Sequence, residues 1–252
     1  MEKISKILIS QPAPADFERS PYAELEKKHN VKFVFQKFFR IEGVTAIEFR
    51  KDKVNLLDYT GVLMTSRNAV DHYFRMAKDM RIEIPDSMKF FCLNESIALY
   101  LQKYVTYRKR KIFFSKKHVD GLVDIMGGKH KNEKFVIPCA DTGASHLNDI
   151  LDQKNLDYTK AVIFKNVAEE LNETINLDEF QLLVLFSPSG LDSLLQNFPD
   201  VVDKKIFIAT LGANVAQLVK DKNLNLAFQA PTPETPSISA AIDLFLTEHN
   251  KA

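Results

Sequence analysis

The sequence predicts an α/β protein built from two similar lobes, each a parallel sheet flanked by helices. Short apolar runs alternate with helix-length amphipathic stretches along the whole chain, which is the order that parallel strands and crossover helices require. The runs are apolar throughout, as expected of strands covered on both faces. The second half of the chain then repeats the order of the first, and this repetition predicts a duplication.

The first half holds strand-like runs that are each followed by a stretch with apolar residues at helical spacing. Strands are expected at residues 6–10, 31–39, 61–64, 90–93 and 111–114. Helices are expected at residues 21–30, 68–78, 95–103 and 117–126. The run at 31–39 is long and rich in β-forming residues.

The second half repeats this order of strands and helices. KFVI at 134–137 matches KILI at 6–9, and each precedes a proline-containing loop and a helix. The remaining strands are expected at residues 161–164, 182–187, 205–209 and 224–228, with helices at 145–154 and from Ser237 onward. The offsets between matched units drift, which favours a duplicated lobe over a solenoid. The alternative is that such repeated patterns arise in any α/β protein without duplication.

Composition limits the class of protein. The chain has 252 residues, with 34 basic and 33 acidic side chains and a formal net charge of +1. This balance argues against a dedicated nucleic-acid binder. No apolar run is long enough to span a bilayer, and the first residues lack a signal-peptide pattern. Two cysteines, Cys92 and Cys139, cannot make a disulfide framework. A cytoplasmic protein is therefore expected.

Two matched turns are the best candidates for a binding site. Ligands of open parallel sheets bind beyond the carboxyl ends of the strands. There the sequence reads Thr65-Ser66-Arg67-Asn68 in the first half and Ser187-Pro188-Ser189-Gly190 in the second. Each turn has a hydroxyl residue suited to cap the next helix, and a helix start suits a phosphate or carboxylate. A plain helix cap and an anion site are both compatible with these residues.

Well-known catalytic and metal-binding motifs are absent from the sequence. It contains no G-x-G-x-x-G, no P-loop and no G-x-S-x-G. The six histidines show neither H-x-x-x-H nor H-E-x-x-H spacing, so no metal site is expected. A flavodoxin-type cofactor site is a weaker possibility, because residues 11–15 (QPAPA) make a poor phosphate loop.

Two further features each have a functional and a structural interpretation. Cys139 is expected in a loop after the strand at 134–138, as a reactive thiol or, in keeping with the habit of cysteine, as a small buried residue. The basic run Arg108-Lys109-Arg110-Lys111 could steer an anionic ligand or be the solvated start of a strand.

Several motifs, in order along the chain, resemble those of uroporphyrinogen-III synthases. Residues 65–70 (TSRNAV) resemble the family's first strand-to-helix turn, and residues 186–190 (FSPSG) resemble its second-half turn. Residues 231–233 (PTP) resemble its C-terminal segment, and Ile137-Pro138-Cys139 resembles a mid-chain strand end of some members. The correspondence covers nearly the whole chain.

The resemblance implies two flavodoxin-like lobes joined by two extended crossing segments. The crossings would be the runs at 31–41 and 162–167. One lobe would comprise residues 1–37 with 167–252, and the other residues 38–166. The first strand would then lie in the sheet of the C-terminal half.

The resemblance also implies a reaction. The family converts hydroxymethylbilane, a linear tetrapyrrole with eight carboxylates, into uroporphyrinogen III in haem biosynthesis. The last ring is inverted and water is lost, so the protein would be a lyase that needs no cofactor. The chain would act as a monomer, without nucleic-acid or membrane partners. Substrate binding is expected at Thr65, Ser66, Arg67, Asn68, Ser96, Cys139, Ser187, Ser189, Asn214 and Thr232, with Ser66 and Ser187 facing each other across a cleft.

The sequence departs from the family pattern at three places. Ile97 and Asn214 stand where the family often has threonine, and Phe164 stands where it often has a tyrosine that is a candidate proton donor. Ser96, Asn214 or a bound water could take that role, so no catalytic residue is assigned. These departures favour an alternative function, a non-catalytic two-lobe binding or regulatory protein, whereas the matched motifs favour the enzyme.

Overall fold

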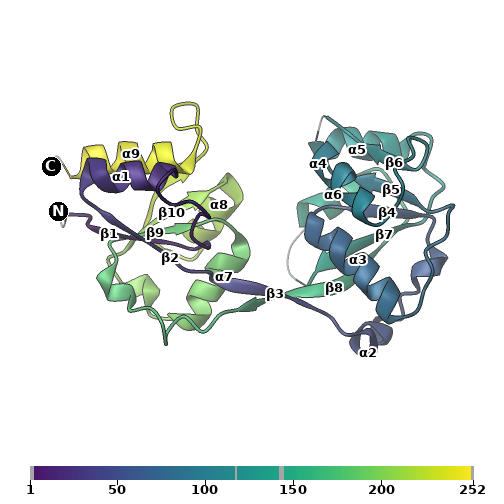
Figure 1. Ribbon diagram of the computed structural model, residues 1–252, viewed down its shortest axis with the longest axis horizontal. Helices are drawn as coiled ribbons and strands as arrows, with labels where there is room; N and C mark the ends of the chain where they lie inside the picture. The colour runs from purple at the N-terminus through teal and green to yellow at the C-terminus, as the bar shows by residue number, and fades with distance from the viewer. Residues whose placement is uncertain (1–2, 117, 142–144, 251–252) are drawn as a thin grey trace. The chain divides into compact units, whose positions relative to one another are not determined.

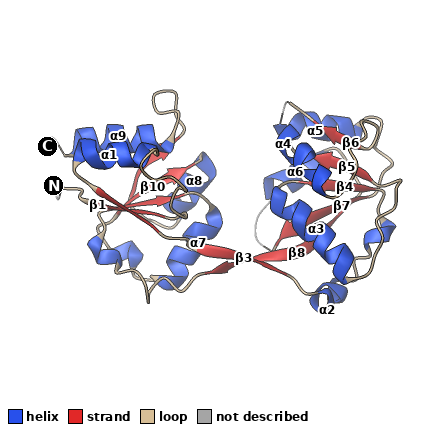
Figure 2. Cartoon of the chain, in the orientation of Figure 1, coloured by secondary structure: helices blue, strands red, loops and turns tan. Residues whose placement is uncertain are grey.

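The computed structural model describes residues 3–116, 118–141 and 145–250, and the chain divides into two compact units (Figure 1). One unit is Met1–Arg40 with Val167–Ala252, and the other is Ile41–Asn166. The family resemblance implies a first boundary after residue 37, three residues earlier. Each unit is a sheet with helices on its two faces (Figure 2), which is the α/β class predicted.

The discontinuous unit contains a five-stranded sheet in the order β11-β10-β9-β1-β2. Its strands, in that order, are Leu226–Ala230, Phe207–Leu211, Leu182–Leu185, Lys6–Ile9 and Lys32–Phe35. β1 pairs in parallel with both β2 and β9. The N-terminal strand therefore lies in the sheet of the C-terminal half.

Helices cover both faces of this sheet. They are α1 (Pro21–His29), α7 (Pro188–Asn197), α8 (Ala213–Asp221) and α9 (Ile238–His249). α1 and α9 lie side by side (Figure 1) and pack on one face through Leu25, Ile242 and Leu246. α7 and α8 pack on the other face through Leu194 and Val219. Alternate residues of β1, β2, β9 and β10 thus enter two separate apolar cores.

The second unit contains a six-stranded sheet in the order β3-β8-β7-β4-β5-β6. Its strands, in that order, are Phe39–Gly43, Tyr158–Ala168, Phe135–Ala140, Gly61–Met64, Lys89–Cys92 and Ile112–Phe114. β4, β5, β6, β7 and β8 pair in parallel. β3 and β8 each contain a boundary between the two units.

The helices of this unit also form two layers. They are α2 (Ala46–Phe49), α3 (Arg67–Asp79), α4 (Glu95–Tyr100), α5 (His118–Gly127) and α6 (Ser145–Gln153). Tyr73 and Met76 of α3 enter the core that also holds Val62 and Met64 of β4. α5 and α6 pack on the opposite face, against Leu63.

Several predicted strands have other bounds in the structure: β8, for example, spans Tyr158–Ala168 where only residues 161–164 were expected. The long run at 31–39 is interrupted, because β2 ends at Phe35 and β3 begins only at Phe39. The strand predicted to end near Pro138 continues through Cys139 to Ala140, as β7. The pairing of β7 with β4 stops at Val136, so Pro138, which has no N–H, does not interrupt a ladder on that side.

Candidate active site

The predicted turns lie at the edge of each sheet where the parallel strands end. Residues 65–68 follow β4 and residues 94–96 follow β5 in one unit. Residues 187–189 follow β9 and residues 212–214 follow β10 in the other. Since neighbouring parallel strands end at the same edge, each pair of turns shares one edge.

Ser66 caps the start of α3. Its backbone is extended, with φ −155° and ψ 165°, and its Oγ accepts the Ala69 N–H at 3.0 Å. The N–H groups of Arg67 and Asn68, in the first turn, have no acceptor within the helix. The half-buried Thr65 precedes this cap. The turn therefore combines a capping hydroxyl with two N–H groups at the positive end of a helix.

Arg67 and Ser96, both predicted site residues, are in direct contact. The Arg67 Nη2 donates a hydrogen bond to the Ser96 Oγ at 3.0 Å, and the guanidinium lies 5.3 Å from the centre of the Tyr100 ring. Asn94 caps α4 by accepting the Ile97 N–H at 3.0 Å. Ile97 is 5% exposed and belongs to the core, so only its backbone faces the turn. The starts of α3 and α4 are thus linked through a cation.

A carboxylate near this contact was missed by the sequence argument. Asp71 accepts hydrogen bonds from the hydroxyls of Tyr100 at 2.7 Å and Tyr104 at 2.5 Å, and from the Lys103 ammonium at 3.3 Å. Partial burial alone would raise the pKa of Asp71, but these three donors outweigh it and hold the pKa below its usual range. The ionised carboxylate holds the Tyr100 ring in place, and the Arg67 guanidinium lies over that ring.

Phe164 lies beside a histidine that the sequence argument also missed. The rings of Phe164 and His72 stack with centroids 5.1 Å apart, and the Arg75 Nε donates to the His72 Nδ1 at 3.2 Å. Neutral His72 therefore carries its proton on Nε2. Burial, and then the charge of Arg75, lower the pKa of His72 below its usual range. One signal was available: His72 follows Asn68 by four residues, which places both on one helix face.

Cys139 does not lie in a loop, as the sequence had predicted. It is half-buried in β7, paired with Val162 of β8, and its thiol donates to the Ala161 carbonyl at 3.7 Å. Burial raises the pKa of Cys139 and raises that of Cys92 to about 12. Both thiols stay protonated near neutral pH, which favours the structural interpretation over the reactive thiol.

Ser187 occupies the matching position in the other unit. It caps α7 with φ −156° and ψ 158°, and its Oγ accepts the Gly190 N–H at 3.2 Å. Pro188 takes the first helical position and has no N–H, so the half-buried Ser189 supplies the one N–H of this turn that the helix does not use. The turn at Ser187 therefore offers fewer donors than the turn at Ser66.

Two buried hydroxyls lie near the Ser187 turn and were not predicted. Ser10 is 6% exposed and Thr210 is fully buried, and neither hydroxyl has a hydrogen-bond partner among the described residues. Thr210 pairs with Leu185, and a Cβ added to Gly190 would lie 3.8 Å from the Ser10 Oγ. Buried unpaired hydroxyls are rare in proteins, so these two are candidates to meet a ligand or water.

Asn214 and Thr232 also lie beyond strand ends of this unit. Asn214 is exposed in the first turn of α8, which starts after Gly212, whose φ of 91° suits a residue without a Cβ. The Thr232 Oγ1 accepts the Thr235 N–H at 3.0 Å and lies 2.7 Å from the Thr235 Oγ1. Thr232 and Thr235 are thus hydrogen-bonded to each other within the loop between β11 and α9.

No three side chains among the described His, Cys, Asp and Glu residues come together as a metal site would require. No described helix is long and apolar enough to cross a bilayer.

The fold and site define a class: two-unit α/β proteins with hydroxyl-capped helix starts, suited to an anionic ligand, at the carboxyl edges of their sheets. A family model, uroporphyrinogen-III synthase HemD, matches residues 22–240. The chain belongs to the uroporphyrinogen-III synthase family. This supports the main functional interpretation of the sequence, and no comparison supports the non-catalytic alternative.

Solved structures show the same fold. The chain resembles the uroporphyrinogen-III synthetase of Helicobacter pylori with a TM-score of 0.60 and 15% identity, over 97% of this chain and 100% of that one. It resembles a mutant uroporphyrinogen III synthase of Thermus thermophilus with a TM-score of 0.59 and 10% identity, over 97% and 99% of the two chains. A comparison with curated protein sequences finds no match.

Proposed function

We propose that this protein is a lyase that converts hydroxymethylbilane into uroporphyrinogen III, inverting the last pyrrole ring and releasing water. The observation that carries the proposal is the family match over residues 22–240, which includes both hydroxyl-capped turns. The cytoplasmic location, the monomeric state and the lack of a need for cofactor or metal stay predictions. So does the expectation that Ser66 and Ser187 face each other.

Substrate carboxylates would bind at the helix starts. The turn at Ser66 supplies a hydroxyl, the N–H groups of Arg67 and Asn68, and a guanidinium already oriented by Ser96. Each charge-assisted hydrogen bond contributes roughly 1.5–3 kcal/mol. The turn at Ser187 adds its hydroxyl and the Ser189 N–H. With the pyrroles supplying the electrons that expel hydroxide, the protein must mainly position the chain for ring closure.

The first prediction tests the reaction itself. Supplied with enzymatically generated hydroxymethylbilane, the protein should yield uroporphyrinogen III, whereas uncatalysed closure yields the type I isomer. Chromatographic separation of the two isomers after oxidation to porphyrins measures the ratio. A type I ratio equal to that of a reaction without the protein would refute the enzyme and leave a binding function.

The second prediction concerns the leaving hydroxide. Phe164 lacks the hydroxyl of the tyrosine that the family often has at this position. We propose that the His72 Nε2–H donates a hydrogen bond to the leaving hydroxide instead, because His72 stacks on Phe164 and is held by Arg75. His72→Phe keeps a ring on Phe164 but removes the donor. It should lower kcat about tenfold, which is ~1.4 kcal/mol of barrier, with KM nearly unchanged.

A second substitution provides the control for this role. Phe164→Tyr in the His72→Phe background adds a hydroxyl to the ring that stacks on residue 72 and should recover part of kcat. Steady-state kinetics of the single and double variants decide the matter. An unchanged kcat in His72→Phe would remove His72 from the mechanism. If kcat and the melting temperature fall together, the effect of His72→Phe is assigned to packing.

A further inference from the structure

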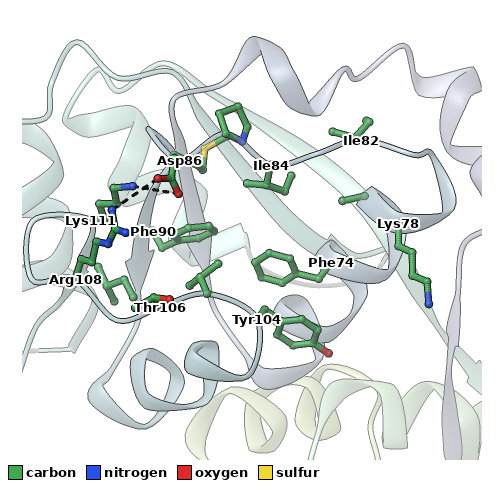
Figure 3. Close-up of a pocket in the computed structure, with 15 residues that line it drawn as sticks. Phe74, Lys78, Ile82, Ile84, Asp86, Phe90, Tyr104, Thr106, Arg108 and Lys111 are labelled. Atoms are coloured by element: carbon green, nitrogen blue, oxygen red, sulfur yellow. Dashed lines mark ion pairs between the residues drawn. The ribbon is translucent and has the colours of Figure 1, made fainter.

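A pocket of about 450 Å³ lies in the unit formed by Ile41–Asn166, away from the candidate active site (Figure 3). Its walls come from the later part of α3, the segment leading into β5, and residues 104–112, which lead into β6. It therefore lies where β5 and β6 begin, whereas the predicted binding turns follow the ends of β4 and β5. Its volume is in the range of small-molecule sites.

Aromatic rings form one wall of the pocket. The rings of Phe74 and Tyr104 are stacked, with their centroids 4.5 Å apart and an angle of 4° between their planes. The centroid of the Phe90 ring lies 6.0 Å from that of Phe74. Ile84 lies across from these rings (Figure 3). The Tyr104 hydroxyl donates to Asp71, which holds that ring in place. Such a wall suits a flat apolar body.

The rim of the pocket carries an excess of positive charge. Arg108 and Lys111 lie at one side, each 3.7 Å from the carboxylate of Asp86, and the Asp86 side chain is 93% exposed. Lys78 lies at the side away from them (Figure 3) and has no ion-pair partner among the residues described. The lining thus holds three cations and one carboxylate, which leaves the rim complementary to an anion.

We propose that this pocket binds a small aromatic molecule that carries an acid group. The ring system would lie along Phe74 and Phe90, and the acid group would take the place of Asp86 beside Arg108 and Lys111. The proposal does not depend on the proposed function, although Tyr104 of the pocket and Tyr100 beside Arg67 both donate hydrogen bonds to Asp71. It also separates the two interpretations of the basic run at 108–111: Arg108 and Lys111 line the pocket, whereas Lys109 and Arg110 do not.

Two fluorescent probes of matched shape test the proposal on the full chain. Anilinonaphthalene sulfonate has a flat ring system and a sulfonate, and phenylnaphthylamine has the same rings without the acid group. The sulfonate should bind saturably and more tightly than the neutral probe. Arg108→Gln with Lys111→Gln should raise the dissociation constant of the sulfonate about tenfold, since two charge-assisted contacts are lost, and leave the neutral probe unaffected.

The same loop offers a control of equal charge. Lys109→Gln with Arg110→Gln removes two exposed cations that do not line the pocket, and should change sulfonate binding less than twofold. Arg67→Gln, at the candidate active site, should also leave it unchanged. Absence of saturable binding, an equal loss in both double variants, or a loss in Arg67→Gln would each overturn the proposal.

Discussion

Removing both capping hydroxyls, Ser66→Ala with Ser187→Ala, should raise KM for hydroxymethylbilane about a hundredfold and increase the share of type I product. Each hydroxyl accepts one N–H of its own helix, from Ala69 or Gly190, so its own proton is free to donate to a substrate carboxylate. Losing one such contact should cost about a decade in KM, at ~1.4 kcal/mol per decade. Poorer positioning of the last ring would then permit uncatalysed closure.

The single variants should differ from one another. Ser66→Ala leaves the N–H groups of Arg67 and Asn68 and the guanidinium of Arg67 in place, so part of the anion site survives. The turn at Ser187 has a proline at its first helical position and loses a larger share of its donors with the hydroxyl. We therefore expect the larger increase in KM for Ser187→Ala.

A plain capping role makes a different prediction. Loss of a serine cap lowers stability by about 1 kcal/mol and leaves KM unchanged. Ser237→Ala is the matched control, because Ser237 caps α9 by accepting the Ala240 N–H at 3.1 Å and is not a predicted site residue. Melting temperature and KM are measured on all variants. If Ser66→Ala and Ser187→Ala behave like Ser237→Ala, the anion sites are refuted.

Local sequence signals were sufficient to predict most of the helix starts to within one residue, whereas several strand ends lie two to four residues from the expected position. An apolar run followed by serine and then by helical spacing predicted β4 with α3 and β9 with α7, because capping and burial are decided within a few residues. The strand end predicted at Pro138 is wrong, since a strand can continue past a proline where its pairing with one neighbouring strand has ended. The end of a ladder depends on a distant strand and leaves no local trace.

The missed site residues have the same explanation. His72 meets Phe164 across 92 positions of sequence, and Ser10 and Thr210 flank Leu185 only because β1 and β10 both pair with β9. A histidine, a serine and a threonine at such positions look like ordinary helix and strand residues. Pairing order and register decide their neighbours, and neither can be predicted from one sequence alone.

Arg75→Met should lower the free energy of unfolding of the unit Ile41–Asn166 by about 3 kcal/mol. The Arg75 Nη2 donates to the carbonyls of Val44 and Ile163, each at 2.9 Å, and these two residues are 3% and 0% exposed. Ile163 also accepts the Val44 N–H, so the larger loss falls on the Val44 carbonyl. A buried acceptor left without a partner costs about 1–3 kcal/mol, and hydrogen bonds from a charged donor contribute similar amounts.

The position of these carbonyls explains why the effect should be large. Val44 directly follows β3, and Ile163 lies in β8, so one guanidinium fastens α3 to the two strands in which the chain passes between its units. Arg75 also bonds His72 and, at 2.8 Å, Asp79. Lysine is one donor group without the planar fork, so Arg75→Lys should recover less than half of the loss.

Two further variants make the test specific to the buried carbonyls. Asp79→Asn removes only a partly exposed ion pair of Arg75 and should change stability by less than about 0.5 kcal/mol. Gly43→Ala acts from the other side, since a Cβ there would lie 2.8 Å from the Arg75 Cζ and should displace the guanidinium. Urea denaturation followed by circular dichroism gives the free energies, and hydrogen exchange at β3 and β8 locates the change. If Arg75→Met is no less stable than Asp79→Asn, these hydrogen bonds do not hold the connecting strands.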